Sequence, residues 1–418
     1  MSWKPLLDDD LALSAMEAAR AIADALEDET LDVPAPSYAY GHAGIALLHG
    51  YLAAVEGDER AADRAEERLG KAVDGIGEQA LSPSFYVSLP GVAWTSQHLE
   101  ELLAGSAEED QNEEVDDWIA EAVRTSPWPG RYDLIYGLIG LGRYALDHPR
   151  RTFTEEVVDQ IVARLEEMAS TFPEGVAWRT AHEVAAPSLA SHFPQGYFDL
   201  GLSHGTPGAI AFLAQAWRAG FQDDQVRRLL DESTSWLLAN RRSGDDGSAF
   251  APFLAPGQSG AGAESCRSAW CYGDPGIAAA LLGAARATGN PAWESEAVAL
   301  ALRDCARPFE DTGVADAELC HGAAGLGHLY NRFYQSTGEE TFARTARRWF
   351  ERALAMRRPG EGIGGYLNWW PEAGTWNADP GLLTGSAGIG LALLAAVSGV
   401  EPNWDRPMLI DLPTRDDA

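Results

Sequence analysis

A short glycine turn that recurs seven times along the chain is the strongest constraint on its fold. In every copy a glycine stands fourth, and six copies also begin with glycine, whereas the second begins with Ser88. The fourth-position glycines, called motif glycines below, are Gly44, Gly91, Gly140, Gly208, Gly276, Gly325 and Gly388. Their spacings of 47, 49, 68, 68, 49 and 63 residues extend over the chain. Self-similarity at such intervals indicates a repeat architecture.

Each turn is followed by apolar residues at helical spacing. After Gly276, for example, Ile277, Leu281 and Ala284 fall on one helix face. In five copies a second glycine follows the motif glycine by 11 to 13 residues, and these are Gly57, Gly220, Gly289, Gly338 and Gly399. Glycine at such a position is typical of a left-handed helix C-cap. Each repeat is therefore expected to begin with a turn and continue as a helix of about three turns.

Charged amphipathic stretches, such as residues 61–76 and 152–170, lie between these apolar helices. They predict outer helices with one solvated face. Seven inner helices alternating with seven outer ones predict an all-α fold, an α/α toroid, with residues 1–418 as a single domain; an open helical solenoid is the alternative. Three segments without helical period are expected to be loops or short strands on one face, namely residues 174–180, 247–254 and 364–370.

The formal net charge of −32 argues against nucleic acid or an anionic membrane surface as a partner, because both repel an acidic protein. The most apolar segment, residues 388–400, is shorter than a bilayer span and is interrupted by glycine. Residues 1–20 have acidic groups where a secretory signal needs an apolar run. A cytoplasmic protein without direct membrane insertion is expected.

Several turns carry chemically reactive side chains. His204 lies in the fourth turn, Cys271 in the fifth, Cys320 and His321 in the sixth, and Asp133 just before the third. In a closed toroid, equivalent positions of consecutive repeats converge at one end of the axis, so these groups would share a small volume. Two thiolates with one or two imidazoles suit zinc, and three protein ligands with an open position are typical of a catalytic zinc site. A small packed residue beside a turn is the alternative interpretation of each cysteine.

The strings SHGTPG, SAWCYGDPG and LCHGAAGLGHLY resemble characteristic segments of the lanthionine synthetase C family. The resemblance covers nearly the full chain and extends to the ending GVEPNWDRPMLIDLP. It implies an α/α toroid, in agreement with the repeat count. It also implies a zinc cofactor bound by Cys271, Cys320 and His321.

The same resemblance implies roles for four further residues. His204 corresponds to the proposed acid or base of the family, and Asp133 to its second catalytic residue. Arg267 and Tyr272 fall on an arginine and a tyrosine of its site. For Tyr272, a ring packed beside the metal is the alternative interpretation, and for Arg267 it is a salt bridge.

The implied activity is that of a lanthionine synthetase, a zinc-dependent cyclase. Such an enzyme adds peptide cysteine thiols to dehydroalanine or dehydrobutyrine and forms (methyl)lanthionine thioether rings in a lanthipeptide precursor. The expected partner is a dehydrated precursor peptide, and a dehydratase is a second candidate. A zinc site suits this chemistry because a thiol of pKa about 8.5 is mostly protonated at neutral pH, whereas a coordinated thiol is deprotonated.

Other interpretations remain open from the sequence. A protein with the same zinc motif can add glutathione or another free thiol to dehydroamino acids. A zinc-stabilised, non-catalytic scaffold that binds peptides would need a fourth protein ligand, which His204 can supply. A carbohydrate-active α/α barrel is disfavoured, because that class needs paired carboxylates and the turns offer cysteine and histidine instead.

Overall fold

The computed structural model describes residues 3–28, 30–33, 35–77, 82–105, 112–244, 247–371 and 373–413. The chain packs as two compact units. Unit 1 comprises Met1–Glu113 with Val314–Asp405, and unit 2 comprises Glu114–Gly313 with Arg406–Ala418. Both units consist mainly of helices with a few short strands, which confirms the predicted all-α class.

A helix begins at every glycine turn. These helices are α2 (His42–Glu56), α4 (Leu89–Ala104), α6 (Leu138–Asp147), α9 (Thr206–Arg218), α11 (Asp274–Thr288), α13 (Ala323–Thr337) and α15 (Ser386–Val397). The N-cap of each is the first residue of its turn, as Gly41 is for α2 and Ser88 for α4. They are buried on most sides, and in α15 every residue from Ser386 to Ala396 is buried. The predicted start of each apolar helix is confirmed.

The motif glycine is required because the preceding backbone crosses it. A Cβ on Gly276 would lie 2.1 Å from the carbonyl oxygen of Trp270, and a Cβ on Gly325 would lie 1.8 Å from that of Leu319. The same clash with the carbonyl oxygen six residues earlier occurs at Gly44, Gly91, Gly208 and Gly388. The turn therefore folds against the first turn of its own helix, and only a residue without a Cβ permits that approach.

We expect Gly276→Ala to destabilise the protein and Gly283→Ala, on the same helix, to stabilise it. A Cβ on Gly283 meets no atom within 4 Å, so alanine there gains up to about 1 kcal/mol of helix propensity. Alanine at Gly276 must displace backbone and should cost about 3 kcal/mol or more. Thermal unfolding of both variants beside the wild type measures the difference. A melting temperature of Gly276→Ala at or above the wild-type value would contradict the steric explanation.

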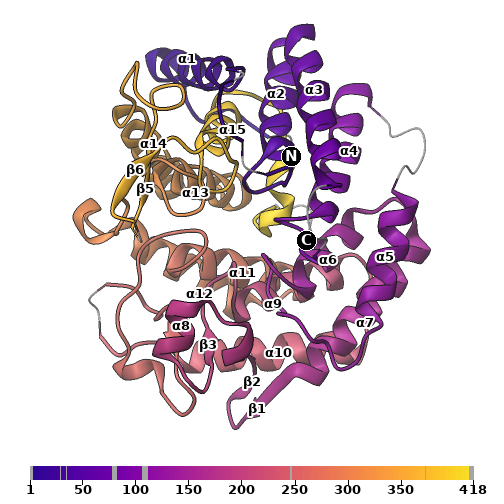
Figure 1. Ribbon diagram of the computed structural model, residues 1–418. Helices are drawn as coiled ribbons and strands as arrows, with labels where there is room; N and C mark the ends of the chain where they lie inside the picture. The colour runs from indigo at the N-terminus through magenta and orange to yellow at the C-terminus, as the bar shows by residue number, and fades with distance from the viewer. Residues whose placement is uncertain are drawn as a thin grey trace. The chain divides into compact units, whose positions relative to one another are not determined.

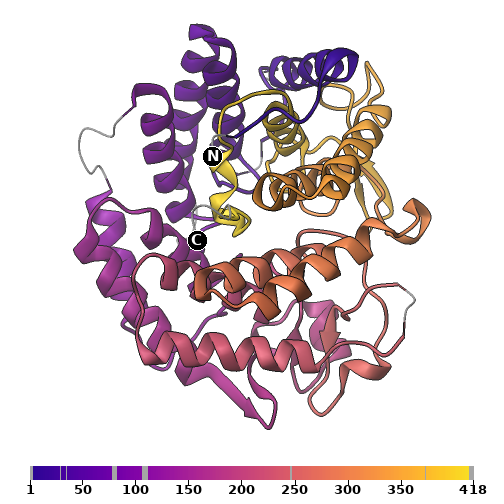
Figure 2. The ribbon, with the colours of Figure 1, turned by 180° about the vertical axis from the view of Figure 1, so that it is seen from behind.

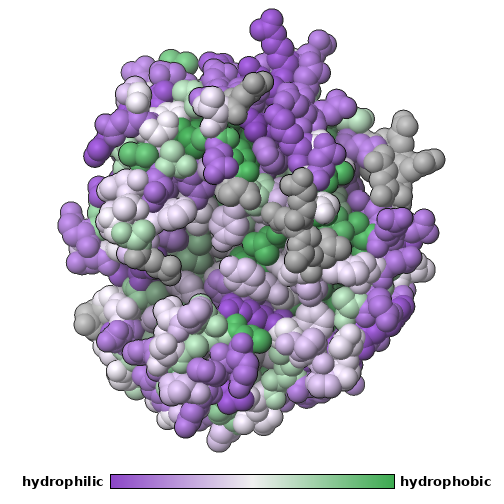
Figure 3. All heavy atoms as spheres, in the orientation of Figure 1, coloured by the Kyte–Doolittle hydropathy of each residue, from purple (hydrophilic) through white to green (hydrophobic). Residues whose placement is uncertain are grey.

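The charged amphipathic stretches also form helices. These are α1 (Asp9–Ala25), α3 (Glu59–Ile76), α5 (Glu113–Val123), α7 (Arg151–Met168), α10 (Asp224–Ala239), α12 (Pro291–Cys305) and α14 (Glu340–Ala355). In unit 1, α3 packs on α2 and α14 on α13; in unit 2, α7 packs on α6, α10 on α9 and α12 on α11 (Figures 1 and 2). The first helix, α1, packs on α15, so the N-terminus supplies the partner of the last apolar helix (Figure 1). Figure 3 shows hydrophilic residues gathered over α3.

Glycine ends several of the apolar helices. The predicted left-handed C-caps are confirmed at Gly57, Gly289 and Gly338. Gly220 is left-handed but lies one residue beyond the C-cap of α9. The prediction for Gly399 is wrong, because the chain leaves α15 through the extended residue Ser398 and needs no left-handed glycine there. Gly105, which the pattern did not single out, is the left-handed C-cap of α4.

Backbone hydrogen bonds join neighbouring turns within unit 1. The amide of Cys320 donates to the carbonyl of Leu383 at 2.9 Å, that of Leu383 donates to Ala39 at 2.9 Å, and that of Ala39 donates to Tyr86 at 3.0 Å. All four residues stand five positions before the motif glycine of their repeats. Equivalent positions of successive repeats are therefore held next to one another.

The strands are short and antiparallel. In unit 2, β1 (Ala169–Phe172), β2 (Gly175–Thr180), β3 (Tyr197–Asp199) and β4 (Phe253–Leu254) form one sheet in that order. In unit 1, β5 (Asn368–Trp370) and β6 (Thr375–Asn377) form a hairpin. The three segments predicted as loops or short strands contain β2, β4 and β5. The remaining elements are the short helix α8 (Pro187–His192) and 3-10 turns at His182–Val184, Gly260–Gly262, Phe309–Asp311 and Asn403–Met408. Among the described residues, no helix is long and apolar enough to span a membrane.

Candidate metal ligands and acid–base pair

His204 and Asp133 form a pair in unit 2. Nδ1 of His204 lies 2.9 Å from Oδ2 of Asp133. The Asp133 carboxylate is buried, its Oδ1 accepts the backbone N–H of Tyr136 at 2.6 Å, and Nη1 of Arg131 lies 3.5 Å from Oδ2. Because Nδ1 is held by this carboxylate, Nε2 is the nitrogen of His204 that can exchange a proton with a substrate.

The surroundings of His204 favour its protonated form. Burial alone would lower the pKa of the imidazole, but the charge and hydrogen bond of Asp133, with the charge of Asp199, outweigh burial, and the pKa is raised above its ordinary value. The ring of Tyr136 stacks on the imidazole with centroids 5.7 Å apart. His204 is therefore fixed in position by a carboxylate on one nitrogen and an aromatic ring on its face.

A second buried carboxylate, Asp199, lies in the same unit. Its Oδ1 accepts the N–H of Gly201 at 2.7 Å, and its Oδ2 accepts the hydroxyl of Tyr272 at 2.8 Å. Burial raises the pKa of Asp199 to about 7, although the positive charge of His204 opposes that shift. The centroid of the Tyr272 ring lies 6.2 Å from that of His204. The hydroxyl proton of Tyr272 is thus engaged by Asp199, beside the acid–base pair.

The sequence interpretation missed Asp199, although a signal for it exists. Asp199, Asp316 and Asp379 each stand nine residues before the motif glycine of their repeats. Each accepts the backbone N–H two residues further on and so shapes its turn. Alignment of the repeats on the motif glycine would have brought these three aspartates into one column.

Cys271 lies in the turn next to that of His204. Cys271 is 6% exposed. Its backbone carbonyl accepts both the N–H and the hydroxyl of Ser203 at 3.4 Å. The amide of Leu134 donates in turn to the carbonyl of Ser203 at 3.2 Å. Three of the predicted site residues of unit 2, Asp133, His204 and Cys271, therefore come from adjacent, hydrogen-bonded turns.

The turn of Cys271 also depends on a left-handed glycine. Gly273 has a φ of 115°, and a Cβ on it would lie 2.0 Å from the carbonyl oxygen of Arg267. The side chain of Arg267 itself is exposed. The backbone of Arg267 thus helps to shape the turn that carries Cys271, and a catalytic role for its guanidinium remains a prediction.

Cys320 and His321 lie in the turn before α13 of unit 1. Cys320 is 8% exposed, and Nδ1 of His321 lies 2.6 Å from Oε1 of Glu318, which is buried. A carboxylate on one imidazole nitrogen orients the other toward a metal, and metal-binding histidines usually have such a partner. Glu318, which the sequence interpretation did not single out, is recognisable as the acidic residue three positions before His321.

The other two cysteines lack these features. None of the four cysteines forms a disulfide. Burial, with a smaller effect of neighbouring Cys271, raises the pKa of the Cys266 thiol to about 12, so this thiol stays protonated. Cys305 is the last residue of α12. Both remain best described as ordinary thiols.

Comparison with known proteins identifies a family and a solved structure that this chain resembles. The family model described as lanthionine synthetase C-like protein matches residues 33–409. Among solved structures, nisin cyclase superposes with a TM-score of 0.75 at 20% sequence identity, over 94% of this chain and 96% of the other. A search of the curated proteins finds no match. The structural likeness confirms the predicted α/α toroid class. Since the family model covers most of the sequence, the chain belongs to the lanthionine synthetase C-like family.

Proposed function

We propose that this protein is a zinc-dependent lanthionine synthetase. It adds cysteine thiols of a dehydrated precursor peptide to dehydroalanine or dehydrobutyrine and closes (methyl)lanthionine rings. The observation that carries the proposal is the Asp133–His204 pair, held one turn away from a buried cysteine in a member of this family. Because the substrate must first lose water from serine or threonine, a dehydratase is the proposed source of the peptide.

We propose Cys271, Cys320 and His321 as the zinc ligands. Their residue types and their places in the segments SAWCYGDPG and LCHGAAGLGHLY support the assignment. Two thiols and an imidazole suit zinc, and three protein ligands leave a position for a substrate. Glu318 provides the carboxylate that orients His321. Bound zinc would supply acidity to a substrate thiol, which then remains nucleophilic beside two other thiolates.

His204 is the proposed acid of the reaction. The addition forms a carbon–sulfur bond at the β-carbon and leaves an enolate that needs a proton at the α-carbon. The raised pKa of His204 favours the protonated imidazole, from which Nε2 can deliver that proton while Asp133 stabilises the charged ring. A positioned acid of this kind typically contributes about 10²- to 10⁴-fold to the rate.

Tyr272 and Arg267 have lesser proposed roles. The Tyr272 hydroxyl donates to Asp199, so its ring bounds the site beside His204 and its oxygen can still accept a hydrogen bond. Arg267 is exposed and is the proposed group that binds the substrate amide oxygen as negative charge develops.

The test is an assay with a synthetic peptide that contains one dehydroalanine and one cysteine. Cyclisation leaves the mass unchanged but removes the thiol, so N-ethylmaleimide labelling followed by mass spectrometry detects it. The zinc-loaded protein should consume the thiol faster than buffer alone or chelator-treated protein. If glutathione adds instead, the peptide gains the mass of glutathione, and the free-thiol alternative is correct. Binding without either product would leave a peptide-binding scaffold.

A further inference from the structure

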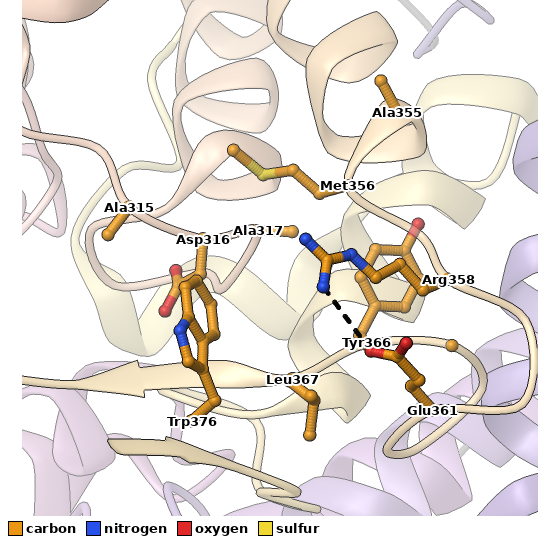
Figure 4. A pocket seen from close by; sticks show the side chains of 11 residues that line it. Ala315, Asp316, Ala317, Ala355, Met356, Arg358, Glu361, Tyr366, Leu367 and Trp376 are labelled. Atoms are coloured by element: carbon orange, nitrogen blue, oxygen red, sulfur yellow. Dashed lines mark ion pairs between the residues drawn. The ribbon is translucent and has the colours of Figure 1, made fainter. Parts of the chain in front are cut away.

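Unit 1 contains a pocket of about 400 Å³ between the end of α14 and the β5–β6 hairpin (Figure 4). Met356, Tyr366 and Trp376 are the largest apolar and aromatic residues in its lining. Asp316 and Ala317 line it as well, and they belong to the turn that leads to Cys320. The pocket therefore borders the segment that carries the proposed zinc ligands of this unit.

One feature indicates that the pocket is suited to a ligand. Trp376 is 51% exposed although it lines the pocket (Figure 4). A ligand would cover this apolar surface.

The charges around the pocket favour an uncharged ligand. Nη1 of Arg358 lies 3.6 Å from Oε2 of Glu361, so these two groups pair with each other (Figure 4). The two oxygens of Asp316 accept the backbone N–H groups of Glu318, at 3.2 Å, and Trp369, at 2.7 Å. The ionised side chains of the lining are thus engaged within the protein.

We propose that this pocket binds an uncharged apolar or aromatic side chain of the precursor peptide, near the cysteine that reacts. The proposal rests on the proposed function, because it places that cysteine at the turn of Cys320 and His321. Only two residues separate Ala317 from Cys320, and an extended peptide advances about 3.3 Å per residue. A side chain one or two positions from the reacting cysteine would reach the pocket and cover the Trp376 ring.

The first experiment compares peptides without any dehydro residue, so that only binding is measured. Each has one cysteine in a glycine–serine background, with phenylalanine or aspartate placed in turn at the two positions on either side. Calorimetry with zinc-loaded protein should show about tenfold tighter binding of the phenylalanine peptide at one of these positions. Absence of a preference at every position would overturn the proposal.

Two tryptophans of one hairpin provide matched variants. Trp376→Ala should abolish the preference for phenylalanine, whereas Trp370→Ala should retain it. Trp370 is 48% exposed on the adjacent strand and does not line the pocket, so both substitutions remove a similarly exposed ring. An equal loss in both variants, or a preference that persists in Trp376→Ala, would contradict the assignment.

The cyclisation assay is independent of these binding results: a peptide preference without cyclisation would support the pocket and reject the enzyme, and cyclisation without any preference would do the reverse.

Discussion

Cys271→Ala is expected to lower the zinc content of the purified protein from about one ion per chain to a small fraction and to abolish cyclisation. The substitution leaves only two of the three proposed ligands, and the thiol of a substrate would no longer be made acidic. The helical circular-dichroism signal should persist, because an open catalytic site contributes less to folding than a closed structural one. Metal analysis by mass spectrometry, with circular dichroism on the same samples, measures both effects. Cys320→Ala should behave in the same way.

Cys266→Ala is the matched control for this prediction. Cys266 and Cys271 lie in the same unit and are 7% and 6% exposed, so the two substitutions remove equally buried thiols. The pKa of Cys266 is raised to about 12 by burial, and a protonated thiol is not a zinc ligand. The control should keep its zinc and its activity. Retention of zinc in Cys271→Ala would refute the ligand assignment, and joint loss of zinc and helix would indicate a structural metal.

Local turn chemistry made much of the fold predictable from the sequence. The motif glycines were visible because a carbonyl oxygen six residues earlier leaves no room for a Cβ, as at Gly276 and Gly325. The ends of helices were less predictable, because a left-handed glycine is only one way to leave a helix; Ser398 ends α15 in an extended conformation instead. The partner of α15 is α1, from the other end of the chain, and no local pattern encodes so distant a contact.

The candidate site was predictable where a residue type is itself uncommon in a turn. Cysteines and histidines beside the turn glycines were therefore recognisable as candidate site residues. In the structure His204 is paired with Asp133, as the proposed acid–base roles require. The supporting carboxylates, Asp199 and Glu318, were missed, because acidic residues are abundant in a chain of net charge −32. Their places relative to the motif glycine and to His321 were a signal, and their buried contacts with Tyr272 and His321 show what they do.

The second result that separates the proposed mechanism from its alternatives is how the folding stability and the cyclisation rate of Asp133→Asn depend on pH. In the wild type burial lowers the pKa of His204, but Asp133, together with the charge of Asp199, outweighs burial and the pKa is raised. Asparagine removes the charge of Asp133 and leaves burial and Asp199, so the pKa of His204 should fall. The pair stabilises the folded protein fully below the unfolded-state pKa of about 6.5, and this stabilisation is lost as the pH rises through the higher folded pKa. The stability difference between wild type and Asp133→Asn should therefore shrink above that folded pKa.

The cyclisation rate should depend on the protonation state of the same imidazole. If His204 delivers a proton from Nε2, the wild-type cyclisation rate falls as the pH rises through the raised pKa, and in Asp133→Asn it falls at lower pH. His204→Asn should lose about 10²- to 10⁴-fold of the cyclisation rate at neutral pH, and its rate should not fall at the pKa of an imidazole.

His148, whose Nε2 lies 3.0 Å from Asp116 in the same unit, provides the control. His148→Asn should affect stability and leave the rate–pH profile of the folded protein unchanged. NMR titration of labelled histidine gives the pKa of His204 directly. A lowered pKa in Asp133→Asn with an unshifted rate profile would show that another group delivers the proton. A cyclisation rate that rises, instead of falling, as the pH passes through the pKa of His204 would make His204 the base that receives the thiol proton.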